Sequence, residues 1–178
     1  RDKPAERIPR RPLIQLAQTE QYLEYLRGHG MTYESLSDLD GILLLSHSST
    51  LQRQSEYREV LDIFIEEIRN NSLDFAAKFH PRDTNVEKFP RPIVEEFATI
   101  PSTIPAELLY ARRPDHLDYV VGHKSTALYT AQWLCNDIRA ASTGGFMRDF
   151  DKQMSKFFDG VKVNVLHTRD ELAKFLHD

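Results

Sequence analysis

Residues 73–84, Leu73-Asp74-Phe75-Ala76-Ala77-Lys78-Phe79-His80-Pro81-Arg82-Asp83-Thr84, hold a short apolar run that ends in a group of basic side chains. The apolar part predicts a buried strand, and Pro81 predicts a turn directly after it. The proline ring also favours an extended backbone at His80, because it disfavours helix at the preceding residue. Ligands of open α/β sheets bind at the carboxyl ends of the strands. Lys78, His80 and Arg82 are therefore expected to face an anionic ligand such as a phosphate.

A second apolar run, Ile42-Leu43-Leu44-Leu45, precedes the first and has the pattern of a strand buried on both faces. Apolar residues at helical spacing predict a helix over residues 55–70 between the two runs: Tyr57, Val60, Leu61, Phe64, Ile65 and Ile68. The loop 46–50 is expected to connect the first strand to this helix. A strand–helix–strand unit of this kind is expected to have a right-handed crossover.

The alternation of strands and helices continues through the rest of the chain. Strands are expected at 97–100, 118–122 and 161–166, and helices at 106–110 and from 126 through Cys135. Residues 87–96 read as a polar connection, and residues 142–145 as a break. Thr168 and Glu171 form a capping box for a terminal helix. This order predicts a doubly wound, mostly parallel sheet over residues 41–178.

Residues 1–40 are predicted to be a basic arm followed by a helical extension. The arm, residues 1–12, holds three prolines and five basic residues: Arg1, Lys3, Arg7, Arg10 and Arg11. A flexible linker is the main expectation for it, and contact with an anionic membrane surface is the alternative. Helical spacing predicts one helix from Pro12 to Arg27, ended by glycines. Residues 31–40 are expected to form a loop, with Asp38, Asp40 and Gly41 as turn residues.

Composition narrows the class of protein. The 178 residues suffice for one ordinary domain, and a net charge of −4 gives no broad electrostatic attraction for nucleic acid. Any phosphate binding must therefore be local. The single cysteine, Cys135, excludes an internal disulfide framework, fits a reducing cytosol, and is expected to pack in the core. No apolar stretch approaches the ~18 residues of a membrane span, and no signal peptide is visible. The first residue, Arg1, is not Met, which is expected of a fragment or a processed chain.

A second candidate site is Gly122-His123-Lys124-Ser125-Thr126, where a strand end and a glycine turn precede two hydroxyl residues at a helix start. Unpaired N–H groups of a helix N-terminus, joined by Ser and Thr hydroxyls, form an anion site. The alternative is that Ser125 or Thr126 only caps the helix. The chain has neither a P-loop nor the dinucleotide-binding glycine pattern, which weakens the nucleotide-hydrolase and dehydrogenase readings.

His80 and Glu107 are the remaining candidates for chemistry. A histidine with a pKa near neutrality can protonate or hydrogen-bond a departing phosphate, although a lone histidine is more often structural. A carboxylate at Glu107 can accept hydrogen bonds from both hydroxyls of a ribose, or only complement a helix dipole. The other six histidines lack metal-ligand spacing, so no zinc site is expected: His29, His47, His116, His123, His167 and His177.

Three ordered motifs resemble the carboxyl-terminal half of bacterial sialyltransferases of the GT-B type. The nearest matches are the lipooligosaccharide sialyltransferases and the capsule polysialyltransferases. Lys78-Phe79-His80-Pro81-Arg82 resembles the His-Pro motif of the family, and Ile104-Pro105-Ala106-Glu107-Leu108-Leu109 its ribose-binding segment. Gly122-His123-Lys124-Ser125-Thr126-Ala127-Leu128 resembles its paired-hydroxyl motif. The resemblance covers about residues 41–178 and implies one Rossmann-like half of a GT-B enzyme.

The resemblance implies inverting transfer of sialic acid from CMP-sialic acid to a glycan acceptor in bacterial surface polysaccharide synthesis. His80 would stabilise or protonate the leaving CMP phosphate, Ser125 and Thr126 would hold that phosphate, and Glu107 would hold the ribose. Lys78, Pro81, Arg82 and Gly122 complete the expected nucleotide site. No metal or other cofactor is expected, and the protein would be cytoplasmic, with a peripheral contact to the inner membrane as an option.

The general base of the family has no clear counterpart here. The family's acidic pair followed by glycine is absent, and Asp38-Leu39-Asp40-Gly41 is only a loose likeness. Asp40, Glu56 and Glu59 remain candidates. A complete GT-B enzyme has two Rossmann-like domains, whereas this length supplies one. Two alternatives stay open: a CMP-Kdo or glycerophosphate transferase of the same fold, and a non-catalytic nucleotide-binding or scaffold domain.

Overall fold

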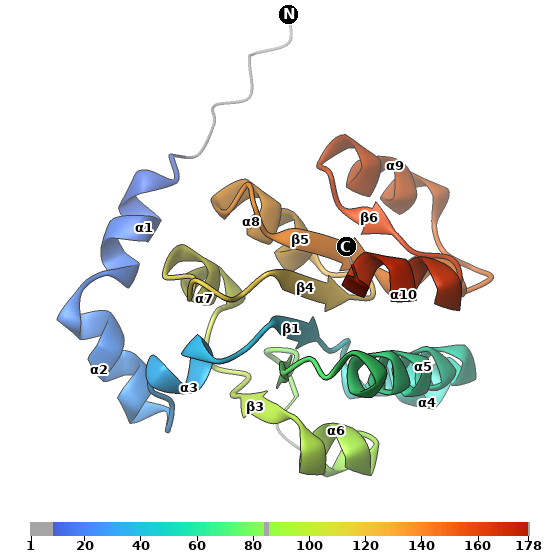
Figure 1. Cartoon of the computed structure of the whole chain (residues 1–178), viewed down its shortest axis with the longest axis horizontal. Coiled ribbons are helices and arrows are strands. Elements are labelled where there is room, and N and C mark those ends of the chain that lie inside the picture. The colour runs from blue at the N-terminus through green and yellow to red at the C-terminus, as the bar shows by residue number, and fades with distance from the viewer. Residues whose placement is uncertain (1–8, 84–85, 178) are drawn as a thin grey trace, which may run out of the picture.

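The computed structural model describes residues 9–83 and 86–177 and contains a six-stranded parallel sheet flanked by helices (Figure 1). The strand order is β3-β2-β1-β4-β5-β6. Its strands are β1 (Gly41–Leu44), β2 (Phe75–Lys78), β3 (Ala98–Ile100), β4 (Tyr119–Gly122), β5 (Arg139–Ser142) and β6 (Asn164–Val165). The predicted doubly wound Rossmann-like α/β fold is confirmed. Arg1, Lys3 and Arg7 of the predicted basic arm, and Thr84, lie outside the described residues.

Helices cover both faces of the sheet. The helices are α1 (Arg11–Ala17), α2 (Glu20–Gly28), α3 (Glu34–Ser37), α4 (Ser48–Arg53), α5 (Ser55–Asn71), α6 (Arg91–Glu96), α7 (Ala106–Ala111), α8 (Thr126–Leu134), α9 (Lys152–Gly160) and α10 (Arg169–His177). Two short 3-10 turns, η1 (Val86–Lys88) and η2 (Thr143–Phe146), lie between them. In the ranges 9–83 and 86–177, no helix is both long and apolar enough to cross a membrane.

Alternate residues of each central strand enter different cores. Ile42 and Leu44 of β1 pack with apolar side chains from α1, α2, α7, α8 and α9. Leu43 and the following Leu45 pack on the other face, against α5, α6 and α10. Period-two alternation on a strand that is buried on both sides explains why its sequence reads as a continuous apolar run. The helices at 11–28 share the first core with the sheet, because Tyr22 and Leu26 are buried within it.

The β1–β2 contact requires glycine at the start of β1. A Cβ atom at Gly41 would lie 2.3 Å from ring atoms of Phe75, with which Gly41 is in register. The Phe75 ring itself is fixed by an edge contact with Phe64 and by stacking near Tyr119. Gly41 was predicted to be a turn residue, which is wrong: it is the first residue of β1, and the absence of a side chain makes room for the aromatic ring.

The amino-terminal expectations were partly wrong. The single helix predicted from Pro12 to Arg27 is two helices: the first ends at Ala17, and the hydroxyl of Thr19 accepts a hydrogen bond from the N–H of Tyr22, which caps the second. The predicted loop over residues 31–40 contains α3, and the predicted loop after β1 becomes helical at Ser48. His47 causes this early start, since its Nδ1 accepts a hydrogen bond from the N–H of Ser49.

Three later segments also differ from expectation. The polar connection at 87–96 contains α6, which begins with Arg91-Pro92 and buries Ile93 completely. Residues 139–142 form β5, which was not predicted because its buried residues, Ala140 and Ala141, lack the bulky side chains typical of strands. The last strand is only two residues long, and α9 precedes it. The other predicted strands and helices are present, with ends shifted by a few residues.

The Gly41–Phe75 contact can be tested by substitution. We expect Gly41→Ala to lower the free energy of unfolding by about 1–3 kcal/mol, because the added methyl group overpacks the strand pair. Urea unfolding followed by circular dichroism measures the change. Adding Phe75→Leu should recover part of the loss, since the smaller side chain leaves room for the methyl group.

Gly28→Ala is the matched control, because nothing lies within 4 Å of a Cβ atom at that position. It lies at the end of α2, where alanine should be neutral or stabilising by up to about 1 kcal/mol. Equal effects of the two glycine substitutions would contradict the packing argument.

Candidate functional site

The carboxyl ends of β2, β1 and β4 meet at one edge of the sheet. β1 lies between the other two strands, and Leu44 is in register with both Lys78 and Gly122. The chain departs from this edge in opposite directions after β1 and β4, which makes it the topological switch point where ligands of such sheets bind. Three loops therefore come together here, residues 45–47, 79–83 and 123–126, and all three carry histidine.

A cavity of about 330 Å³, which we call the Glu107 cavity, opens between two of these loops and the start of α7. It brings together most of the predicted nucleotide site: Lys78, His80, Pro81, Glu107, Ser125 and Thr126. The segment 102–106 forms another wall. The predicted residues therefore share one cavity although they come from three separate parts of the chain.

A second cavity of about 420 Å³, which we call the His123 cavity, adjoins the first. It is lined by the loop after β1, by Thr50 and Gln54, and by residues 123–126. His80, Ser125 and Thr126 line both cavities. These three side chains therefore stand at the junction between the two spaces.

The His80 ring has a defined orientation. Its Nδ1 accepts a hydrogen bond from the backbone N–H of Arg82 at 3.2 Å, so in the neutral ring the proton is carried by Nε2. Burial, with a smaller contribution from the positive charge of Arg82, lowers the pKa of His80 below its usual value. At neutral pH the ring is therefore mainly uncharged and has one N–H donor, at Nε2.

Lys78 is a buried cation at the base of the Glu107 cavity. Its Nζ donates hydrogen bonds to the carbonyl oxygens of Phe79 at 2.8 Å and Ser102 at 3.3 Å. Burial lowers the pKa of Lys78 to about 8, and the negative charge of Glu107 partly opposes that shift. The side chain therefore remains mostly protonated at pH 7 and is stabilised by carbonyl dipoles instead of an ion pair.

Ser125 and Thr126 play different parts in the helix start. Ser125 is the N-cap of α8, where its hydroxyl accepts a hydrogen bond from the N–H of Ala127 at 3.2 Å. The prediction that Ser125 or Thr126 caps the helix is confirmed for Ser125, and its role toward a ligand stays a prediction. Thr126 begins the helix and is exposed. Ser125 accepts hydrogen bonds from the N–H groups of both Ala127 and Leu128. The N–H of Thr126 is the donor at the helix start that can bind an anion at the junction of the cavities.

The remaining predicted site residues lie around the cavities. Glu107 is in the first turn of α7, and its carboxylate is 3.5 Å from the hydroxyl of Thr130. Arg82 is exposed, and its side chain lines neither cavity. Gly122 ends β4, where a Cβ atom would lie 3.0 Å from that of Leu44. Its lack of a side chain permits the close approach of the two central strands.

None of the candidate general bases lines either cavity. Asp40 lies at the amino end of β1, where its carboxylate accepts a hydrogen bond from the N–H of Asp74. Glu56 is in the first turn of α5 and lies 3.4 Å from the guanidinium of Arg148. Glu59 is exposed on the same helix. Of the residues lining the two cavities, only Glu107 has a carboxylate.

A buried carboxylate that the sequence did not single out joins two of the loops. Asp83 accepts hydrogen bonds from both the N–H and the hydroxyl of Ser48, at 2.9 and 2.6 Å, and its own N–H donates to the carbonyl of His80 at 2.9 Å. Nε2 of His47 lies 3.6 Å from the same carboxylate, and the His47 ring meets the His80 ring edge to face. These contacts hold the His80 loop against the start of α4.

The sequence contained part of the signal for this arrangement. His47 directly follows the strand pattern at 42–45, and parallel strands place their carboxyl ends at one sheet edge. The pairing of Asp83 with Ser48, in contrast, depends on tertiary contacts.

His123 is almost fully buried, and burial lowers its pKa to about 4. Cys135 is half-buried at the end of α8, and its thiol donates to the carbonyl of Tyr110.

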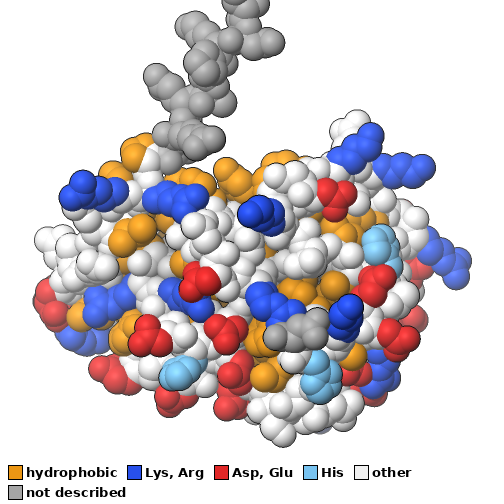
Figure 2. Space-filling view, turned by 45° about the horizontal axis from the view of Figure 1, so that its top comes forward, with side chains coloured by type: hydrophobic (Ala, Val, Ile, Leu, Met, Phe, Trp, Pro, Cys, Tyr) orange, Lys and Arg blue, Asp and Glu red, His pale blue; other side chains and the backbone are white. Residues whose placement is uncertain are grey.

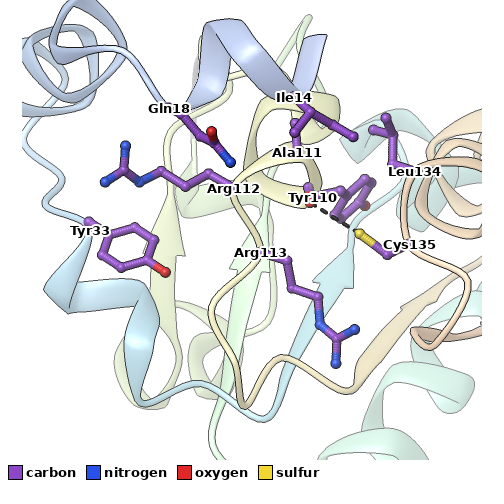
Figure 3. A pocket seen from close by; sticks show the side chains of 9 residues that line it. All are labelled: Ile14, Gln18, Tyr33, Tyr110, Ala111, Arg112, Arg113, Leu134 and Cys135. Atoms are coloured by element: carbon purple, nitrogen blue, oxygen red, sulfur yellow. Dashed lines mark hydrogen bonds between the residues drawn. The ribbon is translucent and has the colours of Figure 1, made fainter. Parts of the chain in front are cut away.

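Another cavity of about 420 Å³ lies at the far ends of α7 and α8 (Figure 3). Figure 3 shows Gln18, Tyr33 and Arg112 on one side of it and Cys135 on the other. Its cations already have protein partners. The Arg112 guanidinium lies 4.7 Å from the centre of the Tyr33 ring and donates to a backbone carbonyl, and Arg113 pairs with two aspartates. The carboxyl-edge cavities are therefore the better anion site.

The charge distribution supports a local site. On the face shown in Figure 2, Lys and Arg side chains are interspersed with Asp and Glu and form no single basic patch. Within residues 9–83 and 86–177, no three His, Cys, Asp or Glu side chains are grouped so that they could hold a metal ion.

No protein-family model and no curated protein matches this sequence.

Lys78 should make stability depend on pH in a defined window. Its pKa is about 8 in the folded chain and 10.5 for an unperturbed lysine. Between these values the unfolded chain binds more protons, so the free energy of unfolding should rise with pH. We expect the difference between the native protein and Lys78→Met to increase in favour of the native protein from pH 8 to 10.5. Urea unfolding at several pH values measures it, and a flat difference would contradict the burial of the cation.

The Asp83–Ser48 contact should contribute measurably to stability. We expect Ser48→Ala to cost about 1–3 kcal/mol of unfolding free energy, since it removes a hydroxyl donor from a buried carboxylate. Ser155→Ala in α9 is the control, because that residue is only partly buried. Equal unfolding midpoints of the two variants in urea would show that the contact is dispensable.

Proposed function

We propose that this chain is the donor-binding half of a sialyltransferase-like glycosyltransferase of the GT-B type. It would bind CMP-sialic acid for transfer to a glycan acceptor in bacterial surface polysaccharide synthesis. One observation carries the proposal. His80, Ser125 and Thr126 stand at the junction of two cavities, and Glu107 and Lys78 line the first of them. The sequence resemblance assigns these same residues to the leaving nucleotide.

In the proposed complex, the Glu107 cavity holds the CMP half of the donor. The Glu107 carboxylate accepts hydrogen bonds from the ribose hydroxyls. The phosphate lies at the junction, where the start of α8 provides an N–H group and Lys78 provides positive charge. Nε2–H of His80 donates to a phosphate oxygen. These groups supply the charge stabilisation without a metal ion.

In the proposed reaction, the bond between the sugar carbon and the phosphate oxygen breaks, and its electron pair stays with CMP. The acceptor hydroxyl attacks the opposite face of the sugar, so the configuration inverts, and its proton passes to a base. His80 stabilises the negative charge that grows on the phosphate, a contribution of ~3–4 kcal/mol for a well-placed donor. The His123 cavity provides the space beyond the phosphate for the sugar.

The base is the missing part of this scheme. Asp40, Glu56 and Glu59 lie outside both cavities, and Glu107 is assigned to the ribose. We propose that a second domain or a partner supplies the base and the acceptor site. On the same resemblance, the enzyme would work at the cytoplasmic face of the inner membrane. A CMP-Kdo or glycerophosphate transferase would use the same phosphate contacts and stays an alternative.

A non-catalytic nucleotide-binding or scaffold domain is the second candidate function. One observation favours it. Glu107 has the one carboxylate among the residues that line the two cavities, and it is assigned to the ribose, so neither cavity offers a carboxylate that could act as the base. Such a domain would bind the nucleotide through the same groups without transferring the sugar. Binding and transfer therefore have to be measured separately.

Thermal stabilisation by nucleotides tests the binding site. We expect CMP at about 100 times its Kd to add ~2.7 kcal/mol of stability, which raises the melting temperature by several degrees. The double variant Ser125→Ala, Thr126→Ala should lose most of this shift, whereas Ser155→Ala should keep it. A shift with CDP or UDP but none with CMP would refute the sialyltransferase proposal.

The role of His80 is tested by kinetics, in the chain together with whatever supplies the acceptor half. We expect His80→Ala to reduce kcat for sialic acid transfer by about 10²–10³-fold while CMP affinity changes little, because the hydrogen bond strengthens as charge develops on the phosphate. His29→Ala, on α2's C-terminal side, is the control. Unchanged kcat in the His80 variant would remove His80 from the reaction.

A further inference from the structure

Two loops at the carboxyl edge are closed by histidine side chains in the same way. Nδ1 of His47 accepts a hydrogen bond from the N–H of Ser49, and Nδ1 of His80 accepts one from the N–H of Arg82, both at 3.2 Å. A backbone N–H can only donate, so each ring, when uncharged, carries its proton on Nε2. The two Nε2–H groups are therefore the donors that these rings can offer to other partners.

Asp83 provides the partner for the first of these donors. Its Oδ1 lies 3.6 Å from Nε2 of His47, and its carboxylate also accepts hydrogen bonds from the N–H and the hydroxyl of Ser48. The Asp83 side chain is only 3% exposed, and His47 is the one basic side chain at ion-pair distance from it within residues 9–83 and 86–177. Three donors around the start of α4 therefore fix the carboxylate, and the carboxylate fixes the His47 ring.

Asp83 also holds the His80 loop. The N–H of Asp83 donates to the carbonyl oxygen of His80 at 2.9 Å. The His47 ring meets the His80 ring edge to face, with the ring centres 5.4 Å apart and the planes at 86°. Nε2 of His80, in contrast, has no partner in the part of the chain that the structure describes. His80 is half-buried and lines both cavities, so this donor remains available to a ligand at their junction.

The charges around His80 come from every element packed against it. Burial is the largest cause of its lowered pKa, Arg82 and His47 lower it further, and Asp83 opposes them. A proton on Nδ1 would also displace the N–H of Arg82, from which this atom accepts a hydrogen bond. The other charged or titratable groups lie at the end of β2 and across the two cavities: Lys78, Glu107, His123 and Lys124. The arrangement therefore stabilises the uncharged ring with its proton on Nε2.

We infer that Asp83 is a positioning residue for the proposed reaction: through its N–H bond to the loop and through the His47 ring, it holds His80 as an uncharged ring whose Nε2–H donates to the phosphate. Asp83 acts without touching the ligand, since it lines neither cavity and its carboxylate is occupied by Ser48 and His47. The identity of the ligand rests on the proposed function, whereas the hold on His80 does not. Asp83 thereby determines which nitrogen of His80 carries the proton.

Nitrogen NMR of the histidine rings in the full chain, without ligand, tests the hold. We expect native His80 to carry its proton on Nε2 and to have a pKa below 6.5, its unperturbed value. Asp83→Ala leaves Ser48 and His47 without their acceptor, so His80 should become more exposed, populate both tautomers and regain a pKa closer to 6.5. Asp83→Asn keeps an oxygen acceptor but removes the charge that favours protonation, so His80 should keep its tautomer and its pKa should fall further.

The opposite directions separate a positioning role from an effect of charge. If the negative charge alone mattered, both substitutions would lower the pKa of His80, and that result would overturn the inference. Asp62→Ala, at an exposed position of α5, is the control and should leave His80 unchanged. If Asp83→Ala fails to fold, His47→Ala should release the tautomer in the same way, while His47→Phe, which keeps a ring against His80, should preserve it. Equal tautomer populations in these two variants would also overturn the inference.

Kinetics, in the chain together with whatever supplies the acceptor half, connect the hold to the proposed reaction. We expect Asp83→Ala to lower kcat by about 10–100-fold with little change in CMP affinity, since it displaces a reacting group without removing a ligand contact. Adding Asp83→Ala to His80→Ala should lower kcat no further, because Asp83 acts through His80. Additive losses in the double variant would show that Asp83 acts independently and would refute its positioning role.

The two measurements distinguish this inference from the proposed function. If the His80 tautomer responds to Asp83 as expected but CMP does not bind, the hold on His80 stands and the proposed nucleotide function fails. If CMP binds and His80 keeps its tautomer and its pKa in Asp83→Ala, the positioning role is refuted and the nucleotide site stands.

Discussion

The parallel register of β1 between β2 and β4 is the constraint on which the site depends. It aligns Leu44 with Lys78 on one side and with Gly122 on the other. The alignment depends on a glycine at each end of the strand pairing. Gly41 makes room for the Phe75 ring at the amino end, and Gly122 lets β4 approach Leu44 at the carboxyl end. A shift of one residue would turn every buried side chain of β1 to the wrong core and separate the loops that hold the histidines.

The same register explains how an acidic protein can bring together the groups of the proposed anion site. The net charge of −4 gives no general attraction, so the positive groups have to be concentrated and protected. Lys78 is the last residue of β2, and its side chain is buried away from water. Two backbone carbonyl oxygens accept hydrogen bonds from its ammonium group. Partial desolvation strengthens its interaction with any bound anion. Because burial disfavours the charged form of the side chain, the pKa of Lys78 is lowered.

The sequence predicted those parts of the fold that depend on local pattern. The apolar runs at 42–45 and 118–122 and the helical face at 57–68 specify elements that bury large side chains, and these are present. β5 was not predicted, because Ala140 and Ala141 become strand residues through the pairing of β5 with β4 and β6. The six predicted residues of the Glu107 cavity follow strand ends or begin helices, so topology alone brings them together. The Asp83–Ser48 contact, 35 residues apart, has no local signature.

The placement of carboxylates distinguishes the two halves of the proposed reaction. A leaving phosphate needs donors and positive charge, and the junction supplies both through His80, Lys78 and the start of α8. An attacking hydroxyl needs a base, and a carboxylate beside the phosphate would repel the donor and raise its own pKa. Both needs are met when the base approaches from the side of the sugar opposite to the phosphate. In the proposed reaction the residues of the two cavities therefore serve the leaving group, and the base that activates the nucleophile would come from outside both cavities.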